Sequence, residues 1–221
     1  MEIWKEFDEF LKSVRLFKDI ETSGLNAMLA CVGVRTQKLK KGKIVLLAGN
    51  KPEHVGIVLS GQLHIIRDDY DGNRSLIAAV TPGEIFAEAL CCADVTESPV
   101  TVIAAVDSTV MLLTFSRIMN TCSASCLHHK KLIENLLKII AGKNIMLQDR
   151  MEIISLKSVR EKVMLFLESF SPKRKKGFVI PFNREEMADY LSVERSALSH
   201  ELAKMKKDGL IEYRKNLFML M

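Results

Sequence analysis

Hydrophobic and polar positions change their spacing twice along the chain, and these changes divide the sequence into three parts. Apolar residues near the N-terminus, among them Trp4, Phe7 and Phe10, recur at helical spacing and predict short amphipathic helices over residues 2–30. From Thr36 to about Phe115, short apolar runs alternate with glycines. We expect strands over residues 43–47, 55–59, 63–67, 75–80, 100–105 and 109–114.

The turn signals in this middle part favour an antiparallel arrangement. Asp71-Gly72 is a dipeptide typical of a two-residue hairpin turn. Many short strands joined by turns at nearly regular spacing predict an antiparallel barrel or jelly roll. We therefore expect residues 1–117 to form a β-roll preceded by short helices.

A single long helical pattern without proline covers residues 118–154. Its a and d positions, spaced alternately by four and three residues, are Ile133, Leu137, Ile140, Asn144, Leu147, Met151 and Ile154. This seam of about three heptads predicts a coiled coil with a second copy of the chain, with Asn144 fixing the register. The alternative is a helix that packs only on its own β-roll. Because Leu136, Ile139 and Met146 form a second apolar face, we expect both kinds of contact.

Residues 155–221 carry the pattern of a winged helix-turn-helix. Residues 158–161 fit a capping box that begins one helix. Residues 183–186 fit another capping box, which begins a helix that runs to residue 191. Residues 192–193 form a tight turn, and residues 194–208 form the next helix. Residues 209–220 predict a helix end followed by two short strands around a polar turn, which make a wing. An ordinary small α/β packing unit is the alternative.

The second helix of this motif is predicted to present four polar side chains outward at the end that enters a major groove. They are Arg195, Ser196, Ser199 and His200. Arg195 is the candidate for a bidentate bond to guanine, since its planar fork matches O6 and N7. Basic residues around the motif are expected on phosphates. They are Lys175 within the basic run 173–176, Arg214 and Lys215, and Arg184 is a further DNA-binding candidate.

The distribution of charge supports this assignment. Residues 1–154 hold 18 basic and 18 acidic residues, whereas residues 155–221 hold 14 basic and 9 acidic ones. The whole net charge of +5 therefore lies in the predicted DNA-binding part. A basic domain beside a neutral body is typical of a nucleic-acid binder, although a merely solvated basic face is the alternative.

The remaining composition narrows the class of protein. No uncharged stretch approaches the roughly 18 residues of a membrane helix, and the charged N-terminus lacks the apolar core of a signal peptide. We expect a cytosolic protein without membrane contact. Five irregularly spaced cysteines argue against a secreted disulfide framework. The predicted fold is α+β, with a sensor β-roll over 1–117, a dimerisation helix over 118–154 and a winged helix-turn-helix over 155–221.

Along nearly its whole length the chain resembles the Crp/Fnr family of bacterial regulators. The matching residues are Gly42, Gly49, 58–61 (Val-Leu-Ser-Gly), 71–72, 82–86, 184–203 and 209–211. The resemblance implies a cyclic-nucleotide-binding-type β-roll, a dimer helix and a winged helix, in the order found above from periodicity. A two-fold dimer is expected to bind a pseudo-palindromic operator in double-stranded DNA. RNA polymerase is an expected protein partner.

Departures from the cyclic-AMP-binding members argue against that effector. Those members carry Gly-Glu-Leu at the phosphate turn and, further along, an Arg-Ser pair whose Arg pairs with the cyclic phosphate. Here the turn is Ala87-Glu88-Ala89 and the later pair is Ser98-Pro99, so a phosphate would lack its charged partner. We expect an unidentified small molecule or a redox signal instead. The candidates for the effector pocket are Phe86, Ala87, Glu88, Ala89 and Ser98.

The cysteines offer a second kind of chemistry. The Ser-Pro pair is closer to the Fnr side of the family, whose oxygen sensors hold an iron–sulfur cluster through several N-terminal cysteines. This N-terminus has only Cys31, so such a cluster is not supported. Cys91-Cys92, Cys122 and Cys126 predict a thiol switch, a metal site or, the interpretation we favour, small buried hydrophobes.

No motif in the sequence indicates an enzyme. We find no P-loop, Rossmann fingerprint, nucleophile elbow or His-Glu-x-x-His, and we assign no metal site and no cofactor. The spacing of His54, His64, His128 and His129 does not indicate a haem ligand. The alternative function is a ligand-binding module that regulates a protein partner. The polar outward residues at 195–200 argue against it, since a protein-docking helix would expose aromatic or aliphatic anchors.

Overall fold

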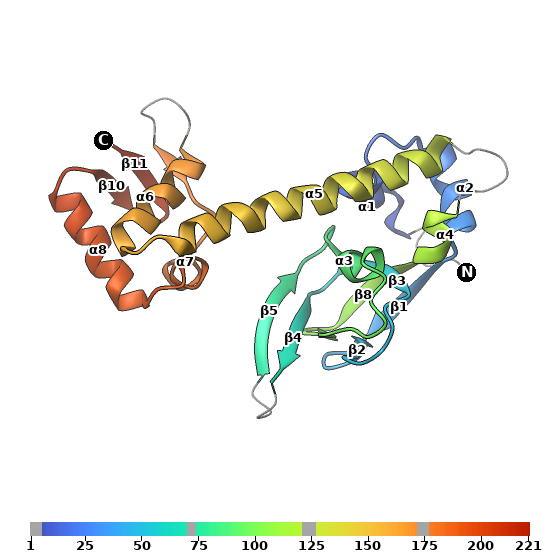
Figure 1. The fold of residues 1–221 in the computed structure, drawn as a ribbon. Coiled ribbons are helices and arrows are strands. Elements are labelled where there is room, and N and C mark those ends of the chain that lie inside the picture. The colour runs from blue at the N-terminus through green and yellow to red at the C-terminus, as the bar shows by residue number, and fades with distance from the viewer. Residues whose placement is uncertain (1–5, 70–73, 121–126, 172–176) are drawn as a thin grey trace. The chain divides into compact units, whose positions relative to one another are not determined.

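The structure is a computed structural model that describes residues 6–69, 74–120, 127–171 and 177–221 (Figure 1). It divides into two compact units, residues 1–141 and 142–221. Several residues with sequence predictions lie outside the described ranges: Trp4, Asp71-Gly72, Cys122, Cys126 and the basic run 173–176 that contains Lys175. None of the described helices is long and apolar enough to cross a membrane.

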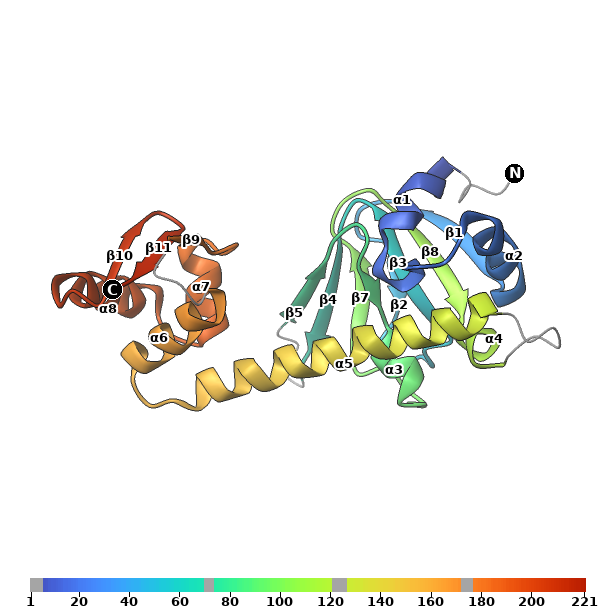
Figure 2. The same cartoon turned by 90° about the horizontal axis from the view of Figure 1, so that it is seen from above.

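Two antiparallel four-stranded sheets form the body of the first unit (Figure 2). Their strand orders are β1-β8-β3-β6 and β2-β7-β4-β5. The strands are β1 (Val34–Leu39), β2 (Ile44–Leu46), β3 (His54–Ser60), β4 (Leu63–Asp68), β5 (Arg74–Val80), β6 (Ile85–Phe86), β7 (Thr101–Ala104) and β8 (Ser108–Thr114). The six predicted strands are confirmed. β1 and β6 were not predicted, because β1 is mostly polar and β6 has only two residues.

The strands β3 and β8 of the first sheet are buried on both faces, and β8 shows why. Successive residues of a strand point to opposite faces. Met111 and Leu113 pack under the N-terminal helices, while Val110 and Leu112 pack against the second sheet. The short helices of this unit are α1 (Asp8–Ser13), the 3-10 helix η2 (Arg15–Phe17), α2 (Thr22–Val32), α3 (Glu88–Cys92) and α4 (Phe115–Met119).

The long helix α5 (Leu127–Ser155) begins later than the sequence pattern predicted. The helical pattern starts at residue 118, but α4 ends at Met119 and Asn120 has an extended backbone. That conformation ends the helical hydrogen-bonding series. The predicted single helix is therefore two helices, separated by residues outside the described ranges.

The side chains of α5 belong to different environments along its length. Leu132 and Leu136 are buried in the core of the first unit, and Ile139 packs partly against it. Met146 was predicted on the same face, but its side chain is 66% exposed. The first unit ends at residue 141, so Met146 lies beyond the core that covers Leu136. Ile153 is buried in the core of the second unit.

The second unit is a winged helix-turn-helix around one apolar core. Its elements are α6 (Val159–Phe170), β9 (Phe178–Val179), α7 (Arg184–Leu191), α8 (Arg195–Lys207), β10 (Ile211–Arg214) and β11 (Leu217–Leu220). The strands form an antiparallel sheet of order β10-β11-β9. The strand β9 has only two residues and ends before Pro181, which has no N–H for the ladder. The predicted α+β architecture is confirmed.

Candidate nucleic-acid interface

The first helix of the motif is fixed at its N-terminus by the predicted capping box. Asn183 Oδ1 accepts hydrogen bonds from the N–H groups of Glu185 and Glu186 at 2.9 and 3.0 Å. Glu186 Oε2 accepts in return from the Asn183 N–H at 2.7 Å. Reciprocal bonds of this kind satisfy the first N–H groups of a helix and define where it starts.

The turn between α7 and α8 is built by the backbone. Ser192 adopts a left-handed conformation with φ of 52°. Its N–H donates to the Asp189 carbonyl at 3.2 Å, and the Val193 N–H donates to the Ala188 carbonyl at 3.0 Å. This pair of bonds ends α7 and reverses the chain within two residues. The side chain of Ala188 is buried and small, so α8 can pack closely against α7.

One face of α8 is buried and the other is exposed. Leu198, Leu202 and Met205 are buried in the core. The four side chains predicted to face outward, Arg195, Ser196, Ser199 and His200, are all exposed. Ser199 Oγ donates to the Arg195 carbonyl at 2.9 Å. Within the described parts of the chain, the Arg195 guanidinium makes no ion pair, so its fork can meet an external acceptor.

The N-terminus of α8 also lacks a side-chain cap. Glu194 occupies the capping position, but its side chain accepts no hydrogen bond from the helix. The first-turn N–H groups of the 13-residue helix are therefore available to an anion, and the helix dipole favours one there.

The basic residues on and beside the wing are placed differently from one another. Arg214 and Lys215 are exposed at the turn between β10 and β11. The Arg184 guanidinium lies 5.0 Å from the ring centroid of Tyr213 and 5.1 Å from that of Phe218. Its Nη2 donates to the Lys215 carbonyl at 3.3 Å. Burial lowers the pKa of Arg184, against the opposing effect of Tyr213. Arg184 thus contacts the wing itself.

Two connections of this unit were not predicted from the sequence. Arg160 on α6 contacts Glu201 Oε1 at 2.6 Å and Asp208 Oδ2 at 2.7 Å. These contacts connect α6 to the middle and to the C-terminal end of α8. The hydrogen bonds that Arg160 donates to Glu201 and to Asp208, in that order of effect, raise its pKa. Arg150, on α5, donates to carbonyls at the end of α7. No periodicity marks either arginine, because each is defined by a partner about 40 residues away.

In the first unit, a cavity of about 190 Å³ opens near two of the predicted effector residues. Its lining includes Phe86 and Ala87, with Arg35, Asn50 and His54 among the polar residues. The Phe86 ring occupies the space where a Cβ on residue 56 would lie, which only glycine permits. Burial lowers the pKa of His54, and the nearby charge of Arg35 lowers it further.

The other predicted effector residues do not line this cavity. The Ser98 side chain is buried, and its hydroxyl donates to the Val100 carbonyl at 2.7 Å. Glu88 is buried at the start of α3, and Ala89 is exposed beside it. The structure therefore brings Phe86 and Ala87 together with residues of β1 and β3 that the sequence did not indicate.

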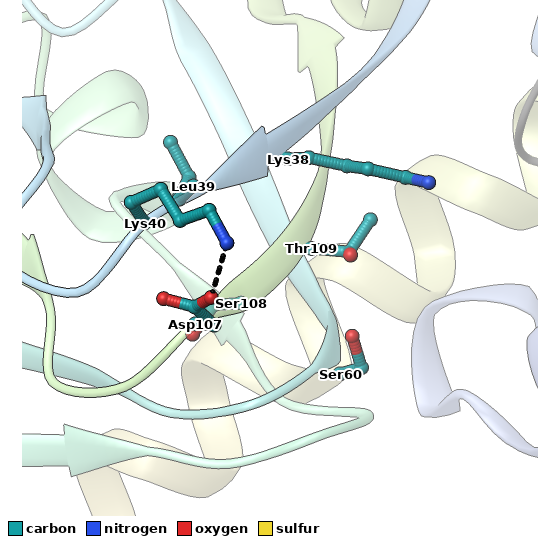
Figure 3. Close-up of a pocket in the computed structure, with 7 residues that line it drawn as sticks. All are labelled: Lys38, Leu39, Lys40, Ser60, Asp107, Ser108 and Thr109. Carbon is teal, nitrogen blue, oxygen red and sulfur yellow. Dashed lines mark hydrogen bonds and ion pairs between the residues drawn. The ribbon is translucent and has the colours of Figure 1, made fainter.

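A larger hollow of about 380 Å³ lies where β1 ends and β8 begins. Figure 3 shows the Lys40 ammonium beside the Asp107 carboxylate, and Ser60 and Thr109 also line the hollow. The Lys40 Nζ and Asp107 Oδ2 atoms are 2.7 Å apart. The hydrogen bond raises the pKa of Lys40 and lowers that of Asp107. None of the predicted effector residues lines this hollow.

Of the described cysteines, Cys91 fits the interpretation as a small buried hydrophobe, whereas Cys31 and Cys92 are exposed. Cys91 is buried, and its Sγ donates to the Pro52 carbonyl at 3.4 Å. Burial raises the pKa of Cys91 to about 12. Burial also raises the pKa of Cys92, although this residue is exposed. A protonated thiol is a poor nucleophile. Within the described ranges, no group of three or more His, Cys, Asp and Glu side chains could hold a metal ion.

Comparisons with solved structures show the same fold. The catabolite activator protein of Thermus thermophilus has a TM-score of 0.55 and 18% identity, over 94% of this chain and 93% of that one. DNR from Pseudomonas aeruginosa has a TM-score of 0.53 and 21% identity, over 100% and 96%. The c-di-GMP responsive global regulator CLP of Xanthomonas campestris has a TM-score of 0.58 and 14% identity, over 90% and 99%.

Comparison with family models gives the assignment. No curated protein matches the sequence. The family model of the cyclic nucleotide-binding domain matches residues 36–125, and that of the Crp-like helix-turn-helix domain matches residues 161–220. Together the two models cover most of the chain, in the order in which the two units occur. The chain therefore belongs to the Crp/Fnr family of transcriptional regulators and has its DNA-binding regulator fold.

Proposed function

We propose that this chain is a homodimeric, non-enzymatic transcription regulator that binds a pseudo-palindromic operator under the control of an effector or redox signal at the β-roll. RNA polymerase is the expected protein partner. The observation that carries the proposal is the exposed polar face of α8. It combines an Arg195 guanidinium that makes no ion pair with any described residue and a helix N-terminus without a side-chain cap. These groups suit base edges and phosphates, respectively.

The proposed homodimer rests on the seam of α5. Leu137, Leu147 and Met151 are 61%, 59% and 65% exposed, and all three occupy a or d positions. Exposed apolar residues in such a row favour a partner helix of the same pattern. Ile133 and Ile140 of the seam also pack partly on the first core, so they would serve both contacts.

The proposed effector site is the cavity lined by Phe86 and Ala87. Ser98 replaces the arginine that pairs with cyclic phosphate in relatives, and its hydroxyl is already bonded to Val100. Cyclic AMP is therefore not the expected effector. Isothermal titration calorimetry on the full-length protein is expected to show no tight binding. A sub-micromolar affinity for cyclic AMP contradicts this part of the proposal.

DNA selection tests the function directly. The full-length protein is used to enrich sequences from a random double-stranded pool, and fluorescence anisotropy then compares the enriched sequence with a scrambled one. We expect two half-sites about one helical turn apart, an advantage of at least about 1,000-fold over scrambled DNA, and affinity that falls as salt rises. Equal affinity for both sequences contradicts the proposal and favours the protein-partner alternative.

A further inference from the structure

Two cations bind the same end of α7, and they come from different helices. Arg150, on α5, donates from Nε to the Tyr190 carbonyl at 3.2 Å and from Nη2 to the Asp189 carbonyl at 3.3 Å. Lys162, on α6, donates to the Leu191 carbonyl at 3.3 Å. These carbonyls lie at the negative end of α7, where the helix offers them few N–H partners.

Arg150 makes the more extensive contact of the two. Its guanidinium also lies 5.1 Å from the centroid of the Tyr190 ring, within the range of a cation–π interaction. The side chain is half-buried. A planar fork that binds two carbonyls and stacks on a ring fixes an orientation, which a lysine with one bond does not.

The place of Arg150 on α5 gives this contact its consequence. Arg150 immediately precedes Met151 of the proposed dimer seam, so the two side chains project about 100° apart around the helix. One turn of α5 thus carries both a seam residue and the residue that binds α7. Ile153, one turn further, is buried in the same core as α7 and α8.

The bound end of α7 leads directly into the recognition helix. Asp189 and Tyr190 stand just before the turn at Ser192, and α8 begins at Arg195. The turn is short and held by two backbone bonds. A constraint on the carbonyls of residues 189 and 190 is therefore a constraint on where α8 starts relative to α5.

We infer that Arg150 is a positioning residue that sets the separation of the two recognition helices, and hence the half-site spacing that this regulator accepts. The inference rests on the proposed function, because it needs a dimer joined along α5. Lys162 supplies the matched control, since it caps the same helix end from α6 and makes no link to α5.

The experiment measures spacing preference with full-length wild type, Arg150→Met, Arg150→Lys and Lys162→Met. Anisotropy is recorded on operators whose spacer is lengthened or shortened one base pair at a time, and on a single half-site. Thermal melting reports the stability of each variant. Methionine keeps much of the length of either side chain and removes the charge.

We expect wild type to prefer one spacer. Arg150→Met is expected to reduce that preference by between about 2-fold and about 30-fold while half-site affinity is kept. Arg150→Lys keeps the charge but not the planar fork, so its spacing preference is expected to lie between that of wild type and that of Arg150→Met. Lys162→Met is expected to lower the melting temperature as Arg150→Met does and to keep the wild-type spacing profile.

Three outcomes overturn the inference. If both arginine variants keep the wild-type profile, Arg150 does not set the spacing. If Lys162→Met flattens the profile as much as Arg150→Met, capping of α7 is the whole effect. In both cases the proposed function stands. If wild type itself shows no preference for paired half-sites, the proposed dimer on DNA fails, and the inference fails with it.

Discussion

The helices α5 and α8 each bury one face and expose the other, but the exposed faces are opposite in character. The exposed seam of α5 carries Leu137, Leu147 and Met151, whereas the exposed face of α8 carries Arg195, Ser196 and His200. Contact between water and an apolar face is unfavourable, so covering that face with another apolar surface lowers the free energy. A polar face is already stable in solvent.

The difference indicates which partner each helix suits. The α5 face fits a second copy of the same helix, because like apolar rows interdigitate. The α8 face fits a hydrogen-bonding surface such as the edge of a base pair. Substitutions confined to one helix can test each of these two assignments separately.

The largest expected effect comes from charging the α5 seam. Replacing Leu137 and Leu147 together by Asp places carboxylates where two helices meet, and burying unpaired charges is strongly unfavourable. We expect a monomer in sedimentation velocity and operator affinity reduced by about 100-fold or more, since both half-sites are no longer bound together. Lys138→Asp, on an exposed position off the seam, serves as control. A double variant that remains dimeric places the interface elsewhere.

A smaller effect is expected from truncating the polar face of α8. Arg195→Ala is expected to cost about 1–3 kcal/mol at the selected operator and to relax preference at one base pair. Arg184→Ala is the comparison variant, because Arg184 contacts the Tyr213 and Phe218 rings of the wing. This variant is expected to weaken binding to selected and scrambled DNA alike. Anisotropy on single-base operator variants measures both. Equal losses on all sequences for Arg195→Ala would identify it as a phosphate contact.

Asn144→Leu sharpens the comparison without breaking it. The polar residue on the seam is expected to specify register and two chains at a cost in stability. Its replacement should keep association but loosen the choice of oligomer. Sedimentation equilibrium over a range of concentrations checks this. An unchanged, purely dimeric distribution shows that Asn144 does not select the oligomer.

The smallest effect is expected from Lys175, which lies outside the described residues and is assigned from sequence alone. Lys175→Ala should weaken selected and scrambled DNA equally and reduce the salt slope by about one unit. Binding isotherms at four or more salt concentrations give that slope. A loss confined to the selected operator would instead assign Lys175 a base contact.

Local patterns in the sequence were sufficient to predict most of the fold. Capping boxes at 158–161 and 183–186 and the inward residues Leu198, Leu202 and Met205 are local patterns, and the structure confirms them. The strand β1 was missed because its partner β8 lies far along the chain and stabilises a mostly polar segment.

The sites were harder to predict than the elements. The exposure of Arg195 follows from its position on one helix. The contacts of Arg184 with Tyr213, and the cavity that joins Arg35 to Phe86, depend on tertiary neighbours that no spacing encodes. The predictions for Cys122 and Cys126 are not tested by the described residues.

The left-handed Ser192 has a consequence for how this motif tolerates change. A non-glycine residue with positive φ costs free energy in the folded chain. Glycine at residue 192 would relieve that cost, yet it would also multiply the conformations open to the unfolded chain. The two terms oppose each other, and the cost of the positive φ is the larger one. Glycine at the sharp turn of the motif is therefore expected to stabilise the folded chain slightly relative to serine, whereas a β-branched residue is expected to destabilise it.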